Sequence, residues 1–530
     1  MSAEPNFLDV KIMGREYRVA CSPEEREALL AAVDLVDGKM RDIAQRTKNT
    51  IAERVAVMAA LNIAHEHLSA AGDGSQKEFV EAVDTSETKR RIGDMGARLD
   101  AVLASTKQAV LERKTFLDTY QVAEQDGALR MAAKQAFYNT SDFTLDKLKA
   151  SSAGQRLRDD FIAYLDGFSP NVQEILTKFK FRDQIQTLVD AHVLGYLIED
   201  FLDPEVNISP LPVKDADGRI KLPALDNHGM GTVFEELIRR FNEENNEEAG
   251  EHFTPRDVVK LMAQLLFLPV ADRIQSGTYL LYDGSCGTGG MLTVAEEALH
   301  ELAASHGKEV SIHLFGQEIN PETYAICKAD LLLKGEGEEA ENIVGGADKS
   351  TLSADQFRAH EFDFMLSNPP YGKSWASEQK FIKDGSEVID PRFKVSLADY
   401  WGNLEVQDAT PRSSDGQLLF LMEMVSKMKA PGDSGLGSRI ASVHNGSSLF
   451  TGDAGGGESN IRRYLIENDL LDAIIQLPNN LFYNTGITTY IWLLNNHKPA
   501  HRQGKVQLID ASLLYQIGRA SCRERVSSPV

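Results

Sequence analysis

The chain has 530 residues, of which 42% are hydrophobic and 25% are charged, and its formal net charge at pH 7 is −23. This length suits about two to four domains, and the composition excludes a disordered or membrane-spanning chain, since no apolar run reaches the roughly 18 residues of a membrane helix. The acidic balance argues against unaided DNA binding, which depends on clustered Lys and Arg, so a DNA substrate would imply a partner that supplies binding surface.

The N-terminal segment predicts a β-hairpin followed by helices. Apolar residues alternate on either side of Gly14 over residues 7–21. The string that starts at Ser22 supplies an N-cap, a proline at the first helical position and early acids, which indicates a helix start. A second helix is predicted over residues 50–71, where spacings of four and three form a seam for a partner helix. Its seam residues are Ile51, Val55, Met58, Asn62 and His65.

This opening, over residues 5–104, resembles ZapA, a small bacterial division protein that binds FtsZ. The stretch FLDVKIMGREYRVACSPEE and the long helix carry the resemblance. It implies self-association through the helices and FtsZ as a possible partner of residues 1–104. A generic hairpin with a coiled coil remains the alternative.

Residues 105–225 predict a mostly helical domain without a catalytic constellation, so packing and partner contacts are its expected role. From about residue 275, short apolar strands alternate with helices, which predicts an α/β fold with a doubly wound, Rossmann-like sheet. The last two strands are separated by a loop, so we expect them to form an antiparallel hairpin at the sheet edge. The predicted strands are 278–284, 311–319, 362–368, 439–445, 472–478 and 488–496, and a helix over 291–307 ends at a C-cap glycine.

The first chemical motif is a glycine-rich loop, DGSCGTGG, between a predicted strand and a helix. Glycines allow a tight turn and close approach of a ligand to the backbone, and the helix N-terminus favours a negative group. The loop is neither a Walker A loop nor a dinucleotide fingerprint. It resembles the D-P-x-x-G-x-G-G loop of methyltransferases, with Gly284 in place of the proline. The resemblance implies S-adenosylmethionine binding by Asp283, Ser285, Cys286, Gly287, Thr288 and Gly289.

The second motif is Gln317-Glu318-Ile319-Asn320, at the end of the next predicted strand, and Glu318 is its candidate functional residue. An acid at this position can accept hydrogen bonds from both hydroxyls of a ribose. A solvated loop glutamate is the alternative, and the neighbouring glycine loop favours the cofactor role.

The third and most specific motif is Asn368-Pro369-Pro370-Tyr371, directly after an apolar strand. The amine of adenine is a poor nucleophile because its lone pair is delocalised into the ring. The Asn368 side-chain carbonyl and the Pro369 backbone carbonyl can accept its hydrogens, while the prolines keep the turn rigid. Tyr371 can stack on a base that has left the helix. These residues are therefore the predicted catalytic group, and no Pro-Cys dipeptide supports attack on cytosine carbon instead.

The fourth motif precedes the glycine loop and consists of Glu251, His252, Phe253, Thr254, Pro255 and Arg256. This string resembles the segment that closes over S-adenosylmethionine in the modification subunits of type I restriction systems. Asp348 occupies the place of the acid that touches the adenine of the cofactor. The resemblance covers about residues 98–516, and it implies that separate specificity and restriction subunits read, cut and translocate the DNA.

The predicted function is methyl transfer to adenine N6 in DNA by direct attack, without a covalent enzyme intermediate. The alternatives are the same chemistry on RNA or on a protein glutamine, and a ZapA-like division protein. No metal site is predicted, since the acidic run 243–251 lacks calcium-loop spacing. The four cysteines form no disulfide framework and no signal peptide is evident, so we expect reduced thiols in a cytoplasmic protein without membrane contact.

Two features predict that the chain joins unrelated pieces. The two resemblances meet inside the string RLDAVL at 98–103, and residues 517–530 resemble a translated sequencing adapter. The predicted segments are the ZapA-like part (1–104), a truncated helical domain of the modification subunit (105–225), the methyltransferase domain (226–516) and a non-native tail (517–530). We therefore expect a chain that binds the cofactor but assembles poorly with a specificity subunit.

Overall fold

The computed structural model divides the chain into two compact units, Met1–Ser86 and Glu87–Val530. In the first unit, β1 (Phe7–Ile12) and β2 (Arg15–Ala20) pair antiparallel, which confirms the predicted hairpin. The helices predicted after it lie outside the described residues. The structure describes residues 7–12, 15–20, 33, 102–150, 155–203, 207, 212–214, 219–223, 254–334, 337–432, 436–482, 487–517 and 527–528.

The second unit begins with a helical region whose helices bury one apolar face each. In α9 (Phe181–Asp190), for example, Phe181, Ile185 and Leu188 are buried at helical spacing, and α8 (Pro170–Lys178) begins with Pro170 directly after Ser169. A short antiparallel pair, β3 (Val213–Lys214) and β4 (Ile220–Leu222), was not predicted, because strands this short carry no periodic signal. The helices are α4 (Lys107–Thr119), α5 (Asp126–Ala133), α6 (Leu145–Lys149), α7 (Gln155–Asp166), α8 (Pro170–Lys178), α9 (Phe181–Asp190) and α10 (Leu194–Phe201).

An eight-stranded sheet follows, in the order β16-β14-β15-β13-β8-β5-β6-β7. All its neighbouring strands pair in parallel except at β15, which runs antiparallel to both β13 and β14. The predicted doubly wound α/β fold is confirmed. The strands are β5 (Gly277–Asp283), β6 (Val310–Glu318), β7 (Ile343–Gly345), β8 (Phe364–Ser367), β13 (Arg439–Asn445), β14 (Leu471–Gln476), β15 (Thr489–Asn495) and β16 (Gln507–Asp510).

The predicted pairing of the last two strands is confirmed, but their predicted place at the sheet edge is wrong. β15 inserts between β13 and β14, and β16 then pairs in parallel with β14 and takes the edge itself. β16 is four residues long and β7 is three, so neither shows the alternation from which strands are predicted.

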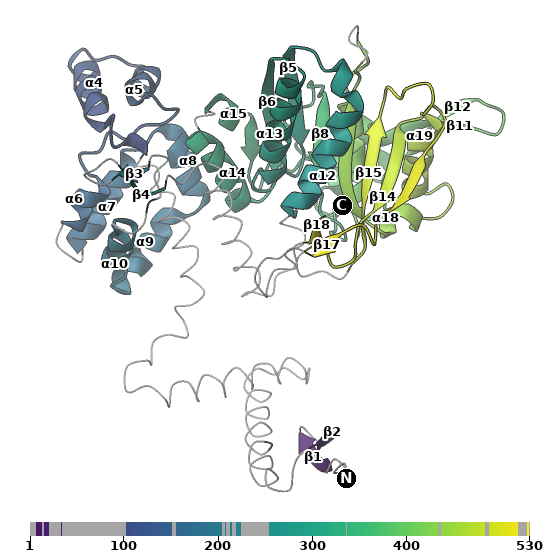
Figure 1. Ribbon diagram of the computed structural model, residues 1–530, viewed down its shortest axis with the longest axis horizontal. Helices are drawn as coiled ribbons and strands as arrows, with labels where there is room; N and C mark the ends of the chain where they lie inside the picture. The colour runs from purple at the N-terminus through teal and green to yellow at the C-terminus, as the bar shows by residue number, and fades with distance from the viewer. Residues whose placement is uncertain are drawn as a thin grey trace. The chain divides into compact units, whose positions relative to one another are not determined.

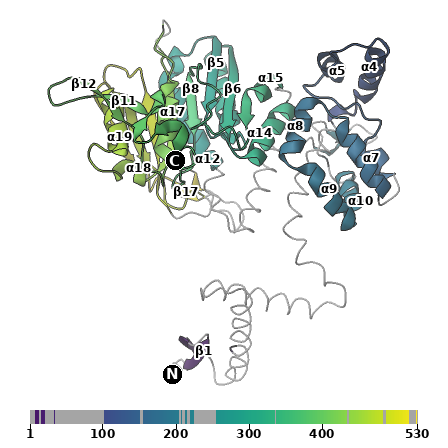
Figure 2. The same cartoon turned by 180° about the vertical axis from the view of Figure 1, so that it is seen from behind.

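Helices cover both faces of the sheet, and the sheet separates two hydrophobic cores. Figure 1 looks onto the face of α12 (Arg256–Phe267) and α13 (Gly290–Ser305), and Figure 2 looks onto the face of α17 (Gln417–Ser426). Successive strand residues point to opposite faces, so Leu281 packs in the first core and Tyr282 in the second. The remaining elements are α14 (Pro321–Lys334), α15 (Gly337–Glu341), α16 (Gln379–Ile382), α18 (Ser447–Phe450), α19 (Gly457–Glu467), 3-10 turns at Leu268–Arg273 and Pro391–Phe393, and the pairs β9 (Lys383–Asp384) with β10 (Glu387–Val388), β11 (Lys394–Ala398) with β12 (Leu404–Asp408), and β17 (Gln516–Ile517) with β18 (Ser527–Ser528).

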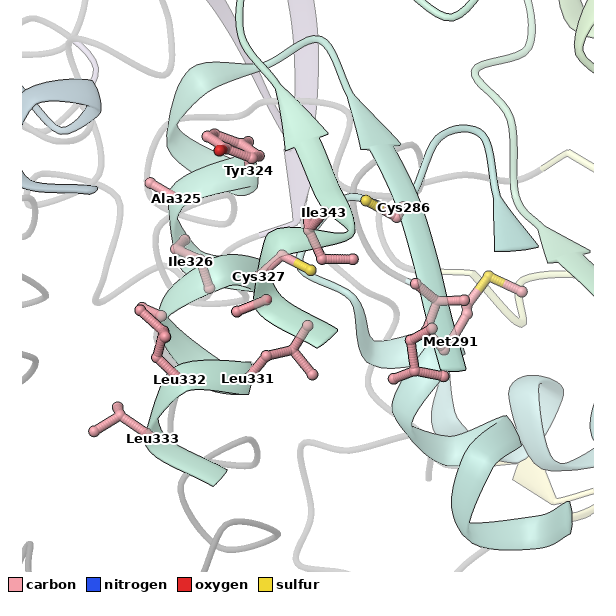
Figure 3. Packing of buried hydrophobic residues seen from close by; sticks show 14 of the residues in the cluster. Cys286, Met291, Tyr324, Ala325, Ile326, Cys327, Leu331, Leu332, Leu333 and Ile343 are labelled. Carbon is pink, nitrogen blue, oxygen red and sulfur yellow. The ribbon is translucent and has the colours of Figure 1, made fainter. Parts of the chain in front are cut away.

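The helical region contacts the sheet domain where α8 lies beside α14 (Figures 1 and 2). Glu174 on α8 accepts hydrogen bonds from the Tyr324 hydroxyl at 2.8 Å and from the Lys328 ammonium group at 3.1 Å. The inner side of α14 carries Cys327, a buried free thiol that lies in the same core as Cys286 (Figure 3). None of the described helices is long and apolar enough to span a membrane.

Candidate active site

A cavity of about 360 Å³ lies at the carboxyl ends of the parallel strands β5, β6 and β8. Ligands bind at this edge of open α/β sheets, and the volume is in the range of small-molecule sites. Residues from six stretches of the chain line it. They are Thr254, Arg256 and Val259; Asp283–Thr288, Gly290 and Met291; Glu318–Asn320 and Thr323; Ser350–Leu352; Asn368, Pro370, Lys373–Trp375 and Glu378; and Gly416 and Phe420.

The glycine loop is fixed at its start by Asp283, the last residue of β5. The buried Asp283 carboxylate accepts hydrogen bonds from the Ser285 N–H at 2.9 Å and from the Ser367 hydroxyl at 2.7 Å. Burial raises the pKa of Asp283 to about 7, although these two hydrogen bonds oppose the shift. Further along the loop, Gly287 has a φ of +54° and open space where a Cβ would lie, so this backbone can approach a ligand closely.

Glu318, the last residue of β6, connects the glycine loop to the next strand. Its carboxylate accepts hydrogen bonds from the Gly287 N–H at 2.8 Å and from the Asn320 N–H at 2.7 Å. The two carboxylate oxygens each accept one of these hydrogen bonds, so the contacts orient Glu318 at the cavity wall. The structure therefore brings the first two predicted motifs together in one cavity.

Asn368 projects into the same cavity from the turn after β8. Its side-chain Nδ2 donates to the Thr254 hydroxyl at 3.1 Å, and its carbonyl Oδ1 is buried without a hydrogen-bond partner among the described residues. A buried carbonyl oxygen without a partner is costly unless a ligand supplies a donor. Pro370 also lines the cavity, whereas Pro369 does not contribute to its wall.

Two predicted site residues lie off the cavity wall. Tyr371 is buried, with 4% of its surface exposed, and it does not line the cavity, so its stacking on a base stays a prediction. Asp348 is exposed on the turn after β7 and also lies off the cavity wall, which is formed there by Ser350, Thr351 and Leu352. Both residues lie beyond the end of a strand, where the alternation of the strand no longer sets the direction of a side chain.

The fourth motif is described only in part. Thr254 and Arg256 line the cavity, and Pro255 is the N-cap residue of α12. Glu251, His252 and Phe253 lie outside the described residues. Among the loop residues, Ser285, Cys286 and Thr288 line the cavity, whereas Gly289 lies behind the wall, where a Cβ would come within 2.5 Å of the Cys327 sulfur.

The segment of Ser350 to Leu352 is held by two residues to which the sequence analysis assigned no role. Gln317, fully buried beside Glu318, donates to the carbonyl groups of Lys349 and Ala354 at 3.0 and 3.1 Å. Arg392 donates to the carbonyl groups of Thr351 at 2.9 Å and Leu352 at 2.6 Å. The amide of Gln317 on an apolar strand was a usable signal, but nothing near Arg392 in the sequence indicates this contact.

The far wall of the cavity follows the Asn-Pro-Pro-Tyr turn and was also missed. Trp375 is buried, and its indole N–H donates to the Arg412 carbonyl at 2.9 Å. A Cβ on Gly416 would lie 3.3 Å from the Trp375 side chain, so glycine leaves the space in front of the ring open. Asp415 accepts a hydrogen bond from the Gly372 N–H at 3.1 Å and so fixes the turn itself.

A buried polar network beneath the glycine loop accounts for Gly284. The Tyr282 hydroxyl donates to Glu423 at 2.9 Å, and burial raises the pKa of Glu423 to about 7 while Lys427 opposes that shift. A Cβ at position 284 would lie 3.0 Å from the Tyr282 oxygen and 3.1 Å from Glu423. Position 284 carries glycine where the methyltransferase motif has proline, and the missing Cβ avoids these two close contacts.

Comparison with known proteins gives three matches along the chain. Residues 225–524 match the family described as N-6 DNA Methylase, residues 97–201 match the HsdM N-terminal domain, and residues 8–99 match the cell division protein ZapA. The ZapA match and the HsdM match overlap at residues 97–99, close to the predicted join. The N-6 DNA Methylase match runs to residue 524 and thus includes part of the stretch 517–530 that we interpreted as non-native.

The individual relatives agree with these matches. The MjaIX methylase subunit of a type I restriction enzyme from Methanocaldococcus jannaschii is 27% identical over 367 residues, which are 66% of this chain and 56% of that protein. The chain spans about half the length of the methylase subunits that it matches. ZapA from Pseudomonas aeruginosa is 38% identical over 107 residues, or 20% of this chain and 96% of ZapA.

Among solved structures, a type I restriction-modification methyltransferase subunit from Streptococcus thermophilus superposes with a TM-score of 0.57 at 22% identity. The superposition covers 85% of this chain and 87% of the other, so the fold is shared. The family match covers more than half of the chain and contains every described residue that lines the cavity. By this match, the chain belongs to the N-6 DNA methylase family.

Proposed function

We propose that this chain transfers a methyl group from S-adenosylmethionine to the N6 atom of adenine in DNA, as the modification subunit of a type I restriction system. The observation that carries the proposal is the unpartnered Asn368 Oδ1 in the cavity that the glycine loop and Glu318 also line. Asn368 Oδ1 would accept one hydrogen of the adenine amine at the cavity wall. The Pro369 carbonyl, which lies off the described wall, would accept the other once the base has entered. The nitrogen lone pair of the amine then becomes available for attack on the methyl group.

The cavity fits the cofactor by the chemistry of its walls. Glu318 offers carboxylate oxygens for ribose hydroxyls, the open backbone at Gly287 allows close approach, and the start of α13 at Gly290 favours a carboxylate. When bound, S-adenosylmethionine would supply an electrophilic methyl group. The Asp283–Thr288 loop would hold it together with the segment from Glu251 to Arg256, and Ser350–Leu352 would form a further wall.

The proposed partners follow from charge and from the relatives. A chain with a net charge of −23 needs help to bind DNA, and its relatives are methylase subunits of multisubunit enzymes. A specificity subunit would read the DNA, a restriction subunit would complete the enzyme, and the complex would act in the cytoplasm. Methylation of RNA or of a protein glutamine is the competing activity.

The test is methyl transfer from labelled cofactor to DNA, RNA and protein, with and without a cognate specificity subunit, with Asn368→Ala as the inactive control. We expect 6-methyladenine in DNA, stimulation by the specificity subunit, and strong salt dependence of DNA binding. Labelling of RNA or protein in preference to DNA would contradict the proposal.

The ZapA match supports a second, additional role for residues 8–99. We propose that this segment mediates self-association, with FtsZ as the candidate partner. Sedimentation of the full chain and of a chain without residues 1–104 tests the first point, and FtsZ bundling tests the second. A full chain that sediments as a monomer and leaves FtsZ filaments unbundled would contradict this role.

A further inference from the structure

The two ends of the Asn368 side-chain amide have different surroundings. Nδ2 donates to the Thr254 hydroxyl, which is the one hydrogen bond that this side chain makes within the described residues, while Oδ1 has no partner. We propose that Thr254 is a positioning residue that fixes which end of the Asn368 amide faces the substrate amine. This inference rests on the proposed function, because the orientation matters only if Asn368 must accept hydrogens.

The orientation needs a fixing contact because the two ends of a carboxamide have nearly the same shape. A half-turn about the bond to the amide carbon exchanges an acceptor for a pair of donors. In the wrong orientation, the Asn368 N–H groups would face the N–H groups of the amine. The methyl acceptor would then lose the hydrogen bond that exposes its lone pair.

Thr254 acts as an acceptor towards Asn368 because its own hydrogen is directed elsewhere. The Thr254 hydroxyl donates to the Met291 sulfur, with 3.8 Å between the oxygen and the sulfur. Its lone pairs are therefore free to receive the Asn368 N–H, and the chain of bonds runs from Asn368 through Thr254 to Met291. Met291 lies in the first turn of α13, so this chain of hydrogen bonds ends on a helix of the sheet domain.

The backbone of the catalytic turn is fixed by contacts other than the hydrogen bonds of Thr254. Ser367, directly before Asn368, donates to Asp283, and Asp415 accepts the Gly372 N–H beyond the turn. These contacts set the position of Asn368 but not the rotation of its amide group. Thr254 precedes Pro255, which disfavours a helical backbone at the residue before it, and Thr254 lines the cavity just before α12 begins.

The first experiment compares Thr254→Val, which keeps the shape but removes the hydroxyl, with Thr254→Ser, which keeps the hydroxyl. We expect Thr254→Val to lower kcat at saturating cofactor by roughly 10-fold, less than the ~10²–10³ cost of removing a preorganised group outright, because the acceptor remains and only its orientation is released. Thr254 also belongs to the segment proposed to hold the cofactor, so cofactor affinity is measured separately and kcat alone reports the orientation. Thr254→Ser should restore most of the rate. Thr293→Val on α13 is the matched control, because that hydroxyl bonds only to carbonyl groups of its own helix turn, those of Gly289 and Gly290.

A double-mutant cycle distinguishes orientation from simple packing. Asp at position 368 presents an acceptor oxygen in either rotation, so Thr254→Val should cost much less in the Asn368→Asp background than in the wild type. An equal cost in both backgrounds, or a loss that appears only as weaker cofactor binding, would overturn the inference.

A readout without turnover separates this inference from the proposed function. With asparagine ¹⁵N-labelled, the side-chain amide signal of Asn368, assigned through Asn368→Ala, should show slow hydrogen exchange in the wild type and fast exchange in Thr254→Val. Unchanged exchange would overturn the role of Thr254. A wild-type chain that shows this dependence but methylates no substrate would instead overturn the proposed function.

Discussion

Ser367 donates a hydrogen bond to Asp283 across 2.7 Å and thereby joins the end of β8 to the end of β5. Ser367 directly precedes Asn368 in the catalytic turn, and Asp283 begins the glycine loop. The Ser285 and Ser367 hydroxyl oxygens lie 2.8 Å apart, which adds a second link between the same two loops. The proposed methyl donor and acceptor sites are thus built on one hydrogen-bonded unit.

The first prediction concerns the chemistry. Asn368→Ala should lower methyl transfer by at least ~10², as loss of a preorganised hydrogen-bonding group at a reacting centre does, while calorimetric affinity for S-adenosylmethionine stays within ~3-fold. The amide makes no hydrogen bond to the glycine loop or to Glu318, so the cofactor walls should persist. A matching loss of cofactor affinity would show that Asn368 is structural.

The second prediction concerns cofactor affinity. Glu318→Ala should weaken S-adenosylmethionine binding by at least ~10-fold, since it removes a charged acceptor and frees the Gly287 N–H that it holds. Glu322→Ala is the control, because this exposed acid lies in the first turn of α14 and outside the cavity wall. Calorimetry that finds equal affinities for the two variants would remove Glu318 from the proposed cofactor site.

How far the site could be predicted depends on where each residue lies relative to a strand. Asp283 and Glu318 end strands whose apolar pattern was clear, and the parallel sheet brings those ends together. Tyr371 and Asp348 lie further along loops, where the sequence gives no direction for the side chain. Arg392 reaches Thr351 across a distance of about forty residues in sequence, a contact that only the folded chain reveals.

The third prediction concerns pH. Burial raises the pKa of Asp283 from 3.8 to about 7, so the folded chain holds this proton more tightly than the unfolded chain. The group therefore favours the folded state at low pH, and this contribution is lost as pH rises through the interval from 3.8 to about 7. The Asp283→Asn side chain cannot ionise and so does not lose this contribution. The free energy of unfolding of Asp283→Asn, minus that of the wild type, should therefore be larger at pH 8 than at pH 5.

Urea denaturation of both chains at the two pH values measures this difference. The Asn side chain still offers an oxygen to Ser285 and Ser367, so any change in hydrogen bonding is common to both conditions and cancels. A relative stability of Asp283→Asn that is the same at pH 5 and pH 8, or better at pH 5, would contradict a buried carboxyl with a raised pKa.

The fourth prediction compares two glycines of the same loop. Gly287 and Gly289 both have positive φ, so alanine at either should cost about 1–2 kcal/mol of backbone strain. At Gly289 the added Cβ would also lie 2.5 Å from the Cys327 sulfur, whereas at Gly287 it meets open space. Gly289→Ala should therefore destabilise the chain more than Gly287→Ala in urea, and Cys327→Ala should recover part of the difference. Equal midpoints for the two alanine variants would show that the loop moves away from α14.

The last prediction concerns the two compact units. The boundary between them falls at Ser86, whereas the cavity, the sheet and the helices that cover it all belong to the second unit. A chain without residues 1–86 should therefore keep its cofactor affinity and the urea midpoint of the sheet domain. If the ZapA-like segment mediates self-association, the same deletion should lower the sedimentation coefficient by more than the lost mass explains. The hairpin variant Val10→Asp is the finer probe, because it places a charge in β1 opposite Tyr17 and leaves the second unit intact. A deletion that abolishes cofactor binding would show that the methylase domain depends on the segment before it, and the two units would then have to be treated as one folded body.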